Sequence, residues 1–178
     1  KKCFVMAMFD AGIRPEEMIN VRVQDVNWDS ERKKYFLYVA FPKEQSFTRT
    51  VDLPICPNLL KEYLHTNEDY QAKRLHEQLF KFDFDSFRVL FQERCQKLLN
   101  RDDVDLYTLR HSSIQYYCDF VYNGNTKALC DRYGWSYSTR MLQVYLSRSK
   151  ARLPDGSELV NRDRVRELEM DKESMQQQ

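Results

Sequence analysis

The residues best suited to chemistry fall into four segments that lie far apart in the sequence. In order they are Ala11–Glu17, which contains Arg14; Lys43, with Arg49–Val51 after it; Tyr107–His111, which contains Arg110; and Gly134–Trp135, with Tyr145 ten residues later. Arginine stays charged at neutral pH, and its planar guanidinium donates two parallel hydrogen bonds to an oxyanion. A tyrosine hydroxyl can act as a nucleophile. Arginines in such segments could therefore bind an anion.

Other catalytic classes find little support in the sequence. It contains no HExxH, GxSxG or P-loop motif. The three histidines are His65, His76 and His111, and the first two lie in a polar region typical of a surface. A metal site or a Ser-His-Asp enzyme is hard to build from these residues, so we expect no metal.

The elements that must position the four segments follow from the hydrophobic pattern. Residues 3–11 predict a helix that ends at Gly12, and Pro15 fits the first turn of a second helix. Residues 35–40 and 47–53 have the composition or alternation of strands and are joined by a loop at 41–46. Residues 27–28 predict a short third strand, paired with the first through a turn near 29–30.

Helices are predicted for most of the remaining chain. They cover 58–65, a strongly amphipathic segment at 86–99, 107–122, 126–133 with Thr126 as N-cap and Gly134 at the end, and a stretch from Ser138 or Thr139 to about 149. The polar residues 66–77 predict a surface connection. Strands that are segregated from helices indicate an α+β fold, mostly α-helical, with a small three-stranded antiparallel sheet.

Length and composition fit one globular domain. The chain has 178 residues, of which 42% are hydrophobic and 31% charged, and no apolar stretch approaches the roughly 18 residues that span a bilayer. Its net charge of +1 is unevenly distributed, because residues 132–152 hold five basic side chains and no acid. Five cysteines without a CxxC pair fit the reducing cytoplasm.

In their order and spacing, the four segments resemble the catalytic boxes of the tyrosine recombinases, the phage-integrase family. The family pattern has an Arg in a GxRxxE turn, a Lys on a β-hairpin, a second Arg in an HxLRH-like segment, a His or Trp after a Gly, and a nucleophilic Tyr. The matching residues here are Arg14, Lys43, Arg110, Trp135 and Tyr145. The resemblance spans residues 3–150, which is nearly the whole chain.

The resemblance implies the tyrosine-recombinase catalytic fold and a role for each matching residue. Arg14 and Arg110 would clamp the non-bridging oxygens of a DNA phosphate, and Lys43 would protonate the leaving 5′ oxygen. Tyr145 would form a covalent 3′-phosphotyrosine, so that no cofactor is required. Tyr107 and Trp135 complete the expected catalytic set, with Glu17 and His111 in supporting roles.

The sequence departs from the common family pattern at two positions. Tyr107 stands where most members have His, and a phenol is a poor base at neutral pH. The loop around Lys43 lacks the common Gly-Lys-Gly form. The Gly134-Trp135 pair and its spacing to Tyr145 look most like the archaeal or archaeal-virus branch of the family.

The resemblance also implies partners and a domain organisation. The expected partner is double-stranded DNA, bound by a homo-tetramer that is a monomer without DNA, with no membrane partner. We expect a catalytic domain at 1–152, with an N-terminal DNA-clamping domain absent from this chain, and a charged tail helix at 153–178 that docks on a neighbouring protomer. DNA contacts are expected from Arg49, Arg140, Arg148, Lys150 and Arg152.

The function that the sequence predicts is site-specific DNA recombination or integration. Two alternatives remain open: a DNA-binding module that has lost catalysis, and a type IB topoisomerase. Ordinary structural roles also remain open for single residues. Arg14 could form a surface ion pair with Glu17, while Trp135 and His111 could serve packing alone.

Overall fold

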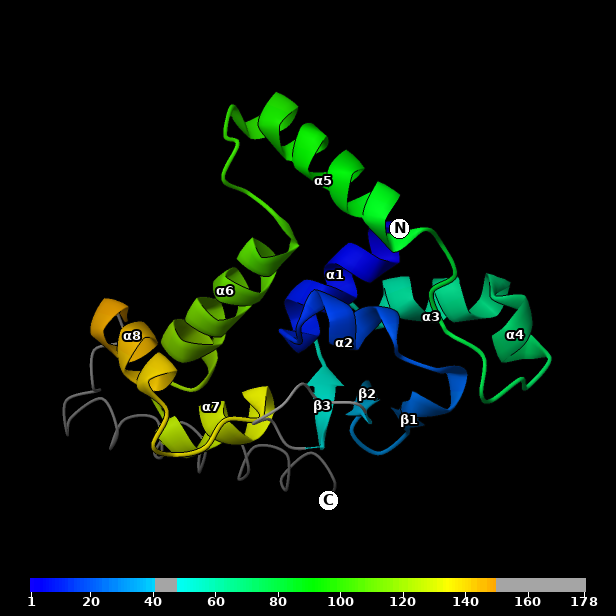
Figure 1. The fold of residues 1–178 in the computed structure, drawn as a ribbon. Coiled ribbons are helices and arrows are strands. Elements are labelled where there is room, and N and C mark those ends of the chain that lie inside the picture. Colours follow the sequence, from blue (N-terminus) through cyan, green and yellow to red (C-terminus); the bar gives the residue numbers. More distant parts are fainter. Residues whose placement is uncertain (41–47, 150–178) are drawn as a thin grey trace, which may run out of the picture.

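The computed structural model describes residues 1–40 and 48–149, which form helices around one small sheet (Figure 1). Lys43, Lys150, Arg152 and the expected tail at 153–178 lie outside the described residues. The elements, in chain order, are α1 (Lys2–Ala11), α2 (Pro15–Ile19), the 3-10 turn η1 (Val23–Asp25), β1 (Val26–Asp29), β2 (Lys34–Val39), β3 (Arg49–Leu53), α3 (Pro57–Thr66), α4 (Glu68–Gln71), α5 (Phe84–Leu99), α6 (Leu106–Tyr116), the π-helical turn η2 (Tyr117–Val121), α7 (Thr126–Tyr133) and α8 (Arg140–Arg148).

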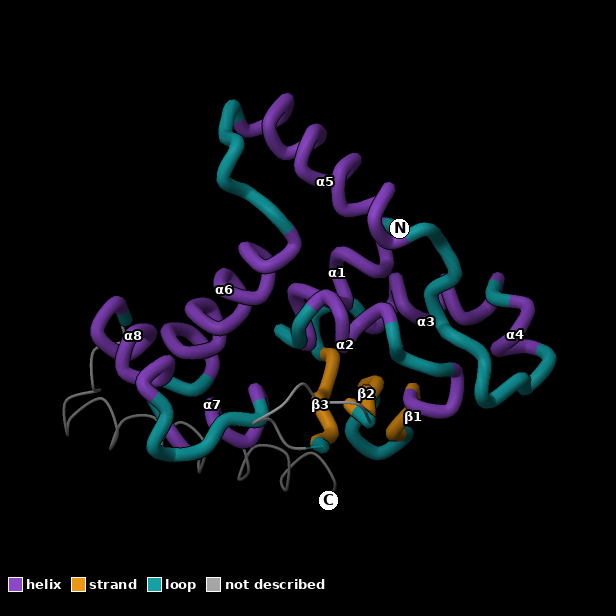
Figure 2. The backbone as a smooth tube through the Cα atoms, viewed as in Figure 1, coloured by secondary structure: helices purple, strands orange, loops and turns teal. Residues whose placement is uncertain are grey.

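The sheet is antiparallel with strand order β1-β2-β3, as predicted (Figure 2). Leu37 in β2 lies opposite Val26 in β1 and Val51 in β3. Alternate side chains of β2, at Tyr35, Leu37 and Val39, are buried. Because side chains alternate between the two faces of a strand, this burial defines the face on which α1, α2 and α3 lie (Figure 1).

Two hydrophobic clusters make up the core. The larger joins α1, α2, the sheet and α3 to the first turn of α5. The smaller contains Ile114, Tyr117, Cys118, Leu129, Cys130, Tyr133, Leu142 and Tyr145. Helix α6 links the two clusters, since Leu106 belongs to the first and Ile114 to the second.

Helix α5 is only partly integrated into the core, although its sequence predicted an amphipathic helix. Phe87 is buried and meets the ring of Phe4 edge-on at 5.5 Å. Leu98 and Leu99, near the other end, are 79% and 57% exposed. The helix points away from the body, so, among the described residues, few lie against its C-terminal half (Figure 1).

Three local predictions are corrected by the structure. The polar segment 66–77 contains the short helix α4. The helix expected over 107–122 is α-helical only to Tyr116, and a π turn follows it, closed by a 2.8 Å hydrogen bond from the Tyr122 N–H to the Tyr117 carbonyl. Asn125, not Thr126, caps α7, because its side chain accepts the Ala128 N–H.

Other boundaries are confirmed by their backbone geometry. Gly12 ends α1 in the left-handed region at φ 61°, and Gly134 ends α7 in the same way at φ 67°. Pro15 occupies the first turn of α2, and Thr139 caps α8. Within the described part of the chain, no helix is long and apolar enough to cross a bilayer.

Candidate active site

The first arginine of the predicted set lies at the start of α2. Arg14 is the N-cap residue, and its backbone N–H donates to Glu17 Oε2 at 2.8 Å. Its guanidinium also pairs with Glu17, with Nη1 3.1 Å from Oε1, while a fifth of the side chain remains exposed (20%). Glu17, 2% exposed, therefore fixes both the backbone and the side chain of Arg14.

Arg49, expected from the sequence as a DNA contact, is a buried partner of the same carboxylate. Its Nη2 lies 3.2 Å from Glu17 Oε2, and its Nε donates to the Arg132 carbonyl at 2.9 Å. In β3, Arg49 alternates with Val51 and Leu53, so it points to the buried face of the sheet. Arg49 holds Glu17 in place from the sheet, and only 7% of Arg49 is exposed.

The shared carboxylate stays ionised because of these two arginines. Burial raises the pKa of Glu17, but Arg49, Arg14 and the hydrogen bonds that they donate together hold this pKa below its ordinary value. The Arg14–Glu17–Arg49 group thus carries a net positive charge in the folded protein.

Arg110 reaches the same region from α6. It is 5% exposed, and its Nη1 donates to the Gly12 carbonyl at 2.7 Å. Among the described residues it forms no ion pair with a carboxylate. Burial, together with the positive charges of Arg14 and Arg49, lowers the pKa of Arg110 to about 10, so the group remains charged at neutral pH.

Two tight contacts bring these segments together. The side chains of Tyr133 and Ser113 occupy the space where a Cβ of Gly12 would stand, and Arg49 Nη1 would lie 2.9 Å from a Cβ at Gly134. The glycines of the first and fourth segments therefore allow α6, α7 and β3 to approach closely.

The predicted nucleophile is packed between two rings. Tyr145, on α8, is 3% exposed and stacks on Trp135 with ring centroids 5.7 Å apart and an interplanar angle of 16°. Its hydroxyl forms a short hydrogen bond with His111 Nδ1. The Arg110 guanidinium lies 5.9 Å from the Trp135 ring centroid, so the indole neighbours both this arginine and Tyr145. Burial raises the pKa of Tyr145, and Arg110 and Arg148 act against that rise.

Tyr107 lies in the site but is bound to a carboxylate. Its hydroxyl donates to Glu16, 2.7 Å from Oε2. Burial and the charge of Glu16 raise the pKa of Tyr107 to about 12, while Arg14 and Arg110 act in the opposite direction. In this arrangement the phenol is a hydrogen-bond donor and a very weak acid.

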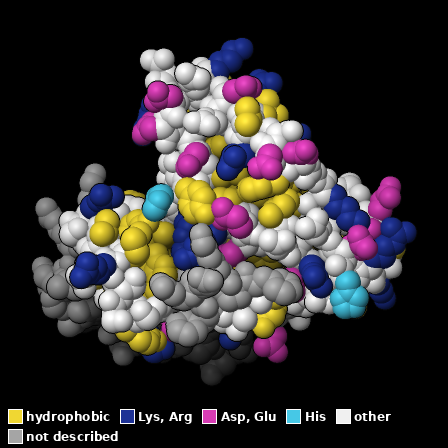
Figure 3. All heavy atoms as spheres, viewed as in Figure 1, with side chains coloured by type: hydrophobic (Ala, Val, Ile, Leu, Met, Phe, Trp, Pro, Cys, Tyr) yellow, Lys and Arg dark blue, Asp and Glu magenta, His cyan; other side chains and the backbone are white. Residues whose placement is uncertain are grey.

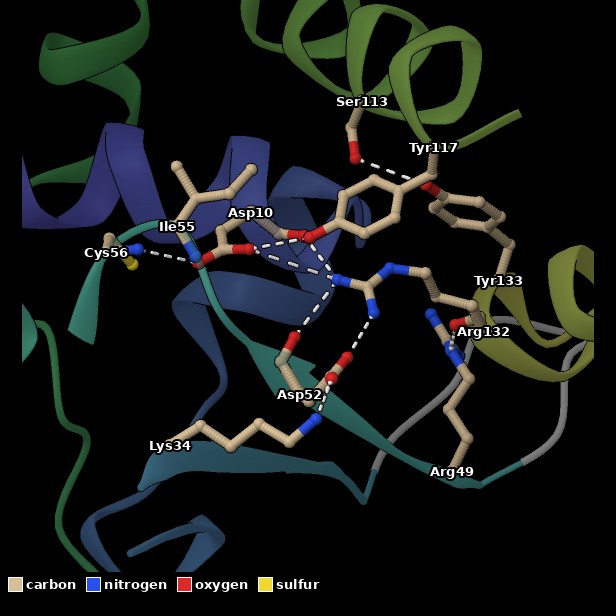
Figure 4. A network of polar contacts seen from close by, with 10 residues as sticks. All are labelled: Asp10, Lys34, Arg49, Asp52, Ile55, Cys56, Ser113, Tyr117, Arg132 and Tyr133. Atoms are coloured by element: carbon tan, nitrogen blue, oxygen red, sulfur yellow. Dashed lines mark hydrogen bonds and ion pairs between the residues drawn. The ribbon is translucent and has the colours of Figure 1, made fainter. Parts of the chain in front are cut away.

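Arg132 is a structural residue that sequence reasoning placed in a basic stretch. It is buried, with Nη1 2.5 Å from Asp52 Oδ1 and Nη2 2.6 Å from the Asp10 carbonyl (Figure 4). Its guanidinium carbon lies 3.8 Å from the centroid of the Tyr117 ring, and Tyr117 in turn donates to Asp10. The helical spacing of Leu129, Arg132 and Tyr133 was the available signal that Arg132 faces inward.

The surface around the site is basic and partly apolar. Side chains of Lys and Arg lie between α6 and α2, next to hydrophobic side chains on the α8 side (Figure 3). A pocket of about 430 Å³ adjoins the site and is lined by residues that include Arg49, Gly134 and Trp135. Arg140 and Arg148, two of the expected DNA contacts, are exposed on α8.

The structure thus brings together most of the predicted set. Five residues of the set lie in one region: Arg14, Tyr107, Arg110, Trp135 and Tyr145. Trp135 is near both Arg110 and Tyr145, and Arg14 and Arg110 act electrostatically on Tyr107. Lys43 cannot be placed, because it lies outside the described residues. His111, expected only as a supporting residue, is the one that contacts the Tyr145 hydroxyl.

Solved structures of Xer recombinases share this arrangement of elements. A pre-cleavage complex of the XerH site-specific recombinase bound to difH substrate superposes with a TM-score of 0.59 at 17% identity, covering 82% of this chain and 42% of that chain. The XerA recombinase gives 0.54 at 20% identity over 87% and 54% of the two chains. A post-cleavage complex of XerH with a palindromic difH substrate gives 0.58 at 15% over 90% and 45%.

The chain has the fold of the Xer recombinases. The predicted tyrosine-recombinase catalytic fold, mostly helical with a three-stranded antiparallel sheet, is therefore confirmed. At these identities the likeness concerns the fold. The chain spans about half the length of the Xer structures that it matches. No protein-family model and no curated protein matches the sequence.

Proposed function

We propose that this chain is the catalytic part of a site-specific DNA recombinase that cuts and rejoins DNA strands through a covalent 3′-phosphotyrosine. The observation that carries the proposal is the convergence of Arg14 and Arg110, from separate helices, beside the Trp135–Tyr145 stack. Arg110 is buried without a carboxylate partner among the described residues, and a buried charge favours a counter-ion. A phosphodiester supplies one.

In the proposed reaction the two guanidinium groups hold the scissile phosphate. As Tyr145 attacks, negative charge grows on the non-bridging oxygens, and fixed donors aimed at those oxygens stabilise the transition state. Trp135 contributes an indole N–H that can also donate to the phosphate. Glu17 holds Arg14 in place, and Arg49 holds Glu17.

Tyr145 forms the covalent bond to the 3′ phosphate, which conserves the energy of the phosphodiester for rejoining. The leaving 5′ oxygen needs a proton, and Lys43, which follows β2 in the sequence, is the proposed donor. No step in this scheme calls for a metal or a cofactor.

The proposed partner is double-stranded DNA, bound by a homo-tetramer that is monomeric without it. Basic side chains on the site face, with Arg140 and Arg148 on α8, support phosphate contacts (Figure 3). Trp135 and its spacing to Tyr145 support a place in the archaeal or archaeal-virus branch. The segment 153–178 is proposed to dock on a neighbouring protomer, and a chain ending at Arg152 should then lose activity.

The test is covalent capture. The full chain is incubated with a pool of duplexes that carry one nick flanked on both sides by random sequence, so that cleavage near the nick releases a short fragment and traps the adduct. We expect a detergent-resistant adduct on a defined subset of sequences, and none with Tyr145→Phe. Absence of a wild-type adduct, or an adduct with Tyr145→Phe, would contradict the proposal.

Adducts that form without sequence preference, together with relaxation of supercoiled plasmid, would indicate a type IB topoisomerase instead.

One observation favours a second candidate, a DNA-binding module without catalysis. Tyr107 stands where most members of the family have a histidine, and its proton is held by Glu16. Sequence-selective binding of the same pool with no adduct would support that function.

A further inference from the structure

We propose that His111 is a catalytic residue: it accepts the phenolic proton of Tyr145 when that oxygen attacks phosphorus. The inference rests on the function proposed above and concerns the base that this reaction requires. A tyrosine hydroxyl is weakly nucleophilic until its proton is removed, so a neighbouring acceptor would raise the rate.

The contact between the two side chains supports this role. His111 Nδ1 and the Tyr145 hydroxyl are hydrogen-bonded to each other, although 34 positions separate them in the sequence. The two rings lie 6.1 Å apart at 27°, and the Trp135 ring also stacks on Tyr145. The phenol is thereby held in one orientation, with its oxygen against the imidazole nitrogen.

The position of His111 next to Arg110 links the base to the phosphate clamp. Both residues are on α6, and α6 contacts α8, which carries Tyr145. The charged groups that act on the phenol are Arg110 from α6 and Arg148 from α8. Both are positive and favour the phenolate that proton transfer would create.

The other groups near the site are less suited to accept this proton. The Tyr107 hydroxyl already donates to Glu16, and Glu17 is committed to Arg14 and Arg49. The remaining histidines are distant in the fold: His65 is in the last turn of α3, and His76 lines a pocket with Arg22 and Gln78. Of the three histidines, His111 alone contacts Tyr145.

The step balances as follows. The Tyr145 O–H bond breaks and its proton passes to His111 Nδ1, giving an imidazolium. The phenolic oxygen forms the O–P bond while the P–O5′ bond breaks, and the 5′ oxygen takes a proton from the general acid. In rejoining, the 5′ hydroxyl gives its proton back to the general acid as its oxygen attacks phosphorus, the Tyr145–phosphate bond breaks, and the phenolate takes a proton back from His111.

The primary variant is His111→Asn, tested on the best duplexes from the capture experiment. The asparagine amide can hydrogen-bond the Tyr145 hydroxyl from about the position of Nδ1, but it cannot take the proton. We expect the rate of adduct formation to fall by about 100-fold or more. His65→Asn, an exposed histidine on α3, is the matched control and should react at the wild-type rate.

Two further readouts separate proton transfer from packing. His111→Ala should regain part of its rate on addition of free imidazole, because His111 is exposed and its place is open to solvent. A duplex with sulfur in place of the bridging 5′ oxygen has a leaving group that needs no proton. The slow rate of His111→Asn should persist on that duplex if His111 is the base.

Each other outcome overturns the inference. A wild-type rate for His111→Asn, or a faster one, would mean that the contact is dispensable or restrains Tyr145. Restoration by the sulfur duplex would make His111 the acid. Failure of imidazole to act on His111→Ala would leave only a structural role. If the wild type itself forms no adduct, the proposed function falls and the inference with it.

Discussion

Arg110 is the side chain on which the candidate site most depends. It is buried and positively charged, and its one hydrogen-bond acceptor among the described residues is the neutral carbonyl of Gly12. Burying a charge without a directly paired counter-charge is unfavourable, so binding of an anion next to Arg110 would be favourable. The geometry of a guanidinium then decides how that anion is held.

For Arg110→Lys we expect adduct formation to slow by about 100-fold or more, because an ammonium keeps the charge but cannot donate the two parallel hydrogen bonds. The measurement is single-turnover capture on a nicked duplex, with circular dichroism to verify folding. A rate within about threefold of wild type would show that charge alone suffices, and would contradict the clamp.

Glu17→Gln should destabilise the protein in a pH-dependent way. The pKa of Glu17 is depressed in the folded state below the ordinary 4.5, so its stabilisation is fully present above about pH 4.5 and is lost as pH falls through the folded value. We expect the variant to lose roughly 3 kcal/mol at neutral pH, since Arg49 loses its buried partner.

Urea unfolding of wild type and Glu17→Gln across pH 2–7 tests this. The gap between the two free energies of unfolding should narrow as pH falls below about 4.5. Asp52, whose pKa is also lowered, titrates in both proteins and cancels in the difference. A gap that is constant over the whole range would rule out the ionised carboxylate as its source.

The sequence was sufficient to predict that several of these residues meet, but not that Arg49 and Arg132 would be buried. Arg14, Arg110, Trp135 and Tyr145 were identified from segment order, and the fold places them together. Arg49 was expected as a DNA contact, and Arg132 was counted only as part of a basic stretch. Their spacing from Val51 and Leu129 faces both inward, where carboxylates far away in sequence receive them.

At the scale of elements, the side chains of Arg132 and Arg49 link α7 to the sheet. Arg132 connects α7 with β3 through Asp52 and with α1 through the Asp10 carbonyl (Figure 4). Lys34 of β2 adds a second cation to Asp52, with Nζ 2.6 Å from Oδ2. Since α7 leads to Trp135 and α8, this joint sets the position of the predicted nucleophile.

Arg132→Met should therefore cost about 3 kcal/mol, because it leaves buried acceptors and Asp52 without their donor. Lys127→Met, on the same helix, removes a solvent-exposed ion pair with Asp131 and should leave the free energy of unfolding within experimental error. Equal effects of the two variants in urea unfolding would contradict the role of Arg132 as a joint.

Two glycines in the left-handed region, one on each side of α7, offer a second test. Gly124, at φ 74°, has room for a Cβ, which would be in ordinary contact with Leu146 at 3.7 Å. Gly124→Ala should cost about 1 kcal/mol from backbone strain alone. Gly134→Ala adds a collision with Arg49 and should cost at least about 1 kcal/mol more, in the same urea assay.

If the two glycine variants lose the same stability, the contact between Gly134 and Arg49 is not tight in solution. If Gly134→Ala is the more stable of the two, the packing of α7 against β3 differs from the one described here.

The sheet and most helix boundaries were predictable, because alternation and capping residues are local signals. The exposed half of α5 was not: its apolar residues have helical spacing, yet Leu98 and Leu99 are exposed, and the helix points away from the sheet (Figure 1). The π turn after Tyr116 was equally hidden. It depends on how Tyr117 and Cys118 pack in the smaller cluster, a tertiary effect with no local sequence signature.

For the whole molecule, the division of the core into two clusters has consequences for dynamics. The larger cluster holds the sheet and α1, whereas the smaller holds η2, α7 and α8. Free energies of local opening follow the amount of buried apolar contact. The part of the chain that carries Trp135 and Tyr145 should therefore open more readily than the part that carries Arg14.

Native-state hydrogen exchange with mass spectrometry, at increasing low urea, measures this difference. Amides of α7 and α8 should exchange through an opening of lower free energy than those of α1 and β2, and their protection should converge only near global unfolding. One common free energy for both groups would indicate a single cooperative unit. Binding of a DNA duplex should raise the hydrogen-exchange protection of α8 amides if DNA holds Tyr145 in place.

The π turn also changes how this chain should be aligned with others. A π turn takes one more residue per hydrogen-bonded turn than an α turn, so it acts like an insertion that no loop reveals. Against a protein whose helix is α throughout, a gapless alignment through this region would match Trp135 and Tyr145 with the wrong neighbours. A one-residue gap placed between Tyr117 and Tyr122 would align Trp135 and Tyr145 with their counterparts again. Sequence profiles built without that gap would misplace these two residues.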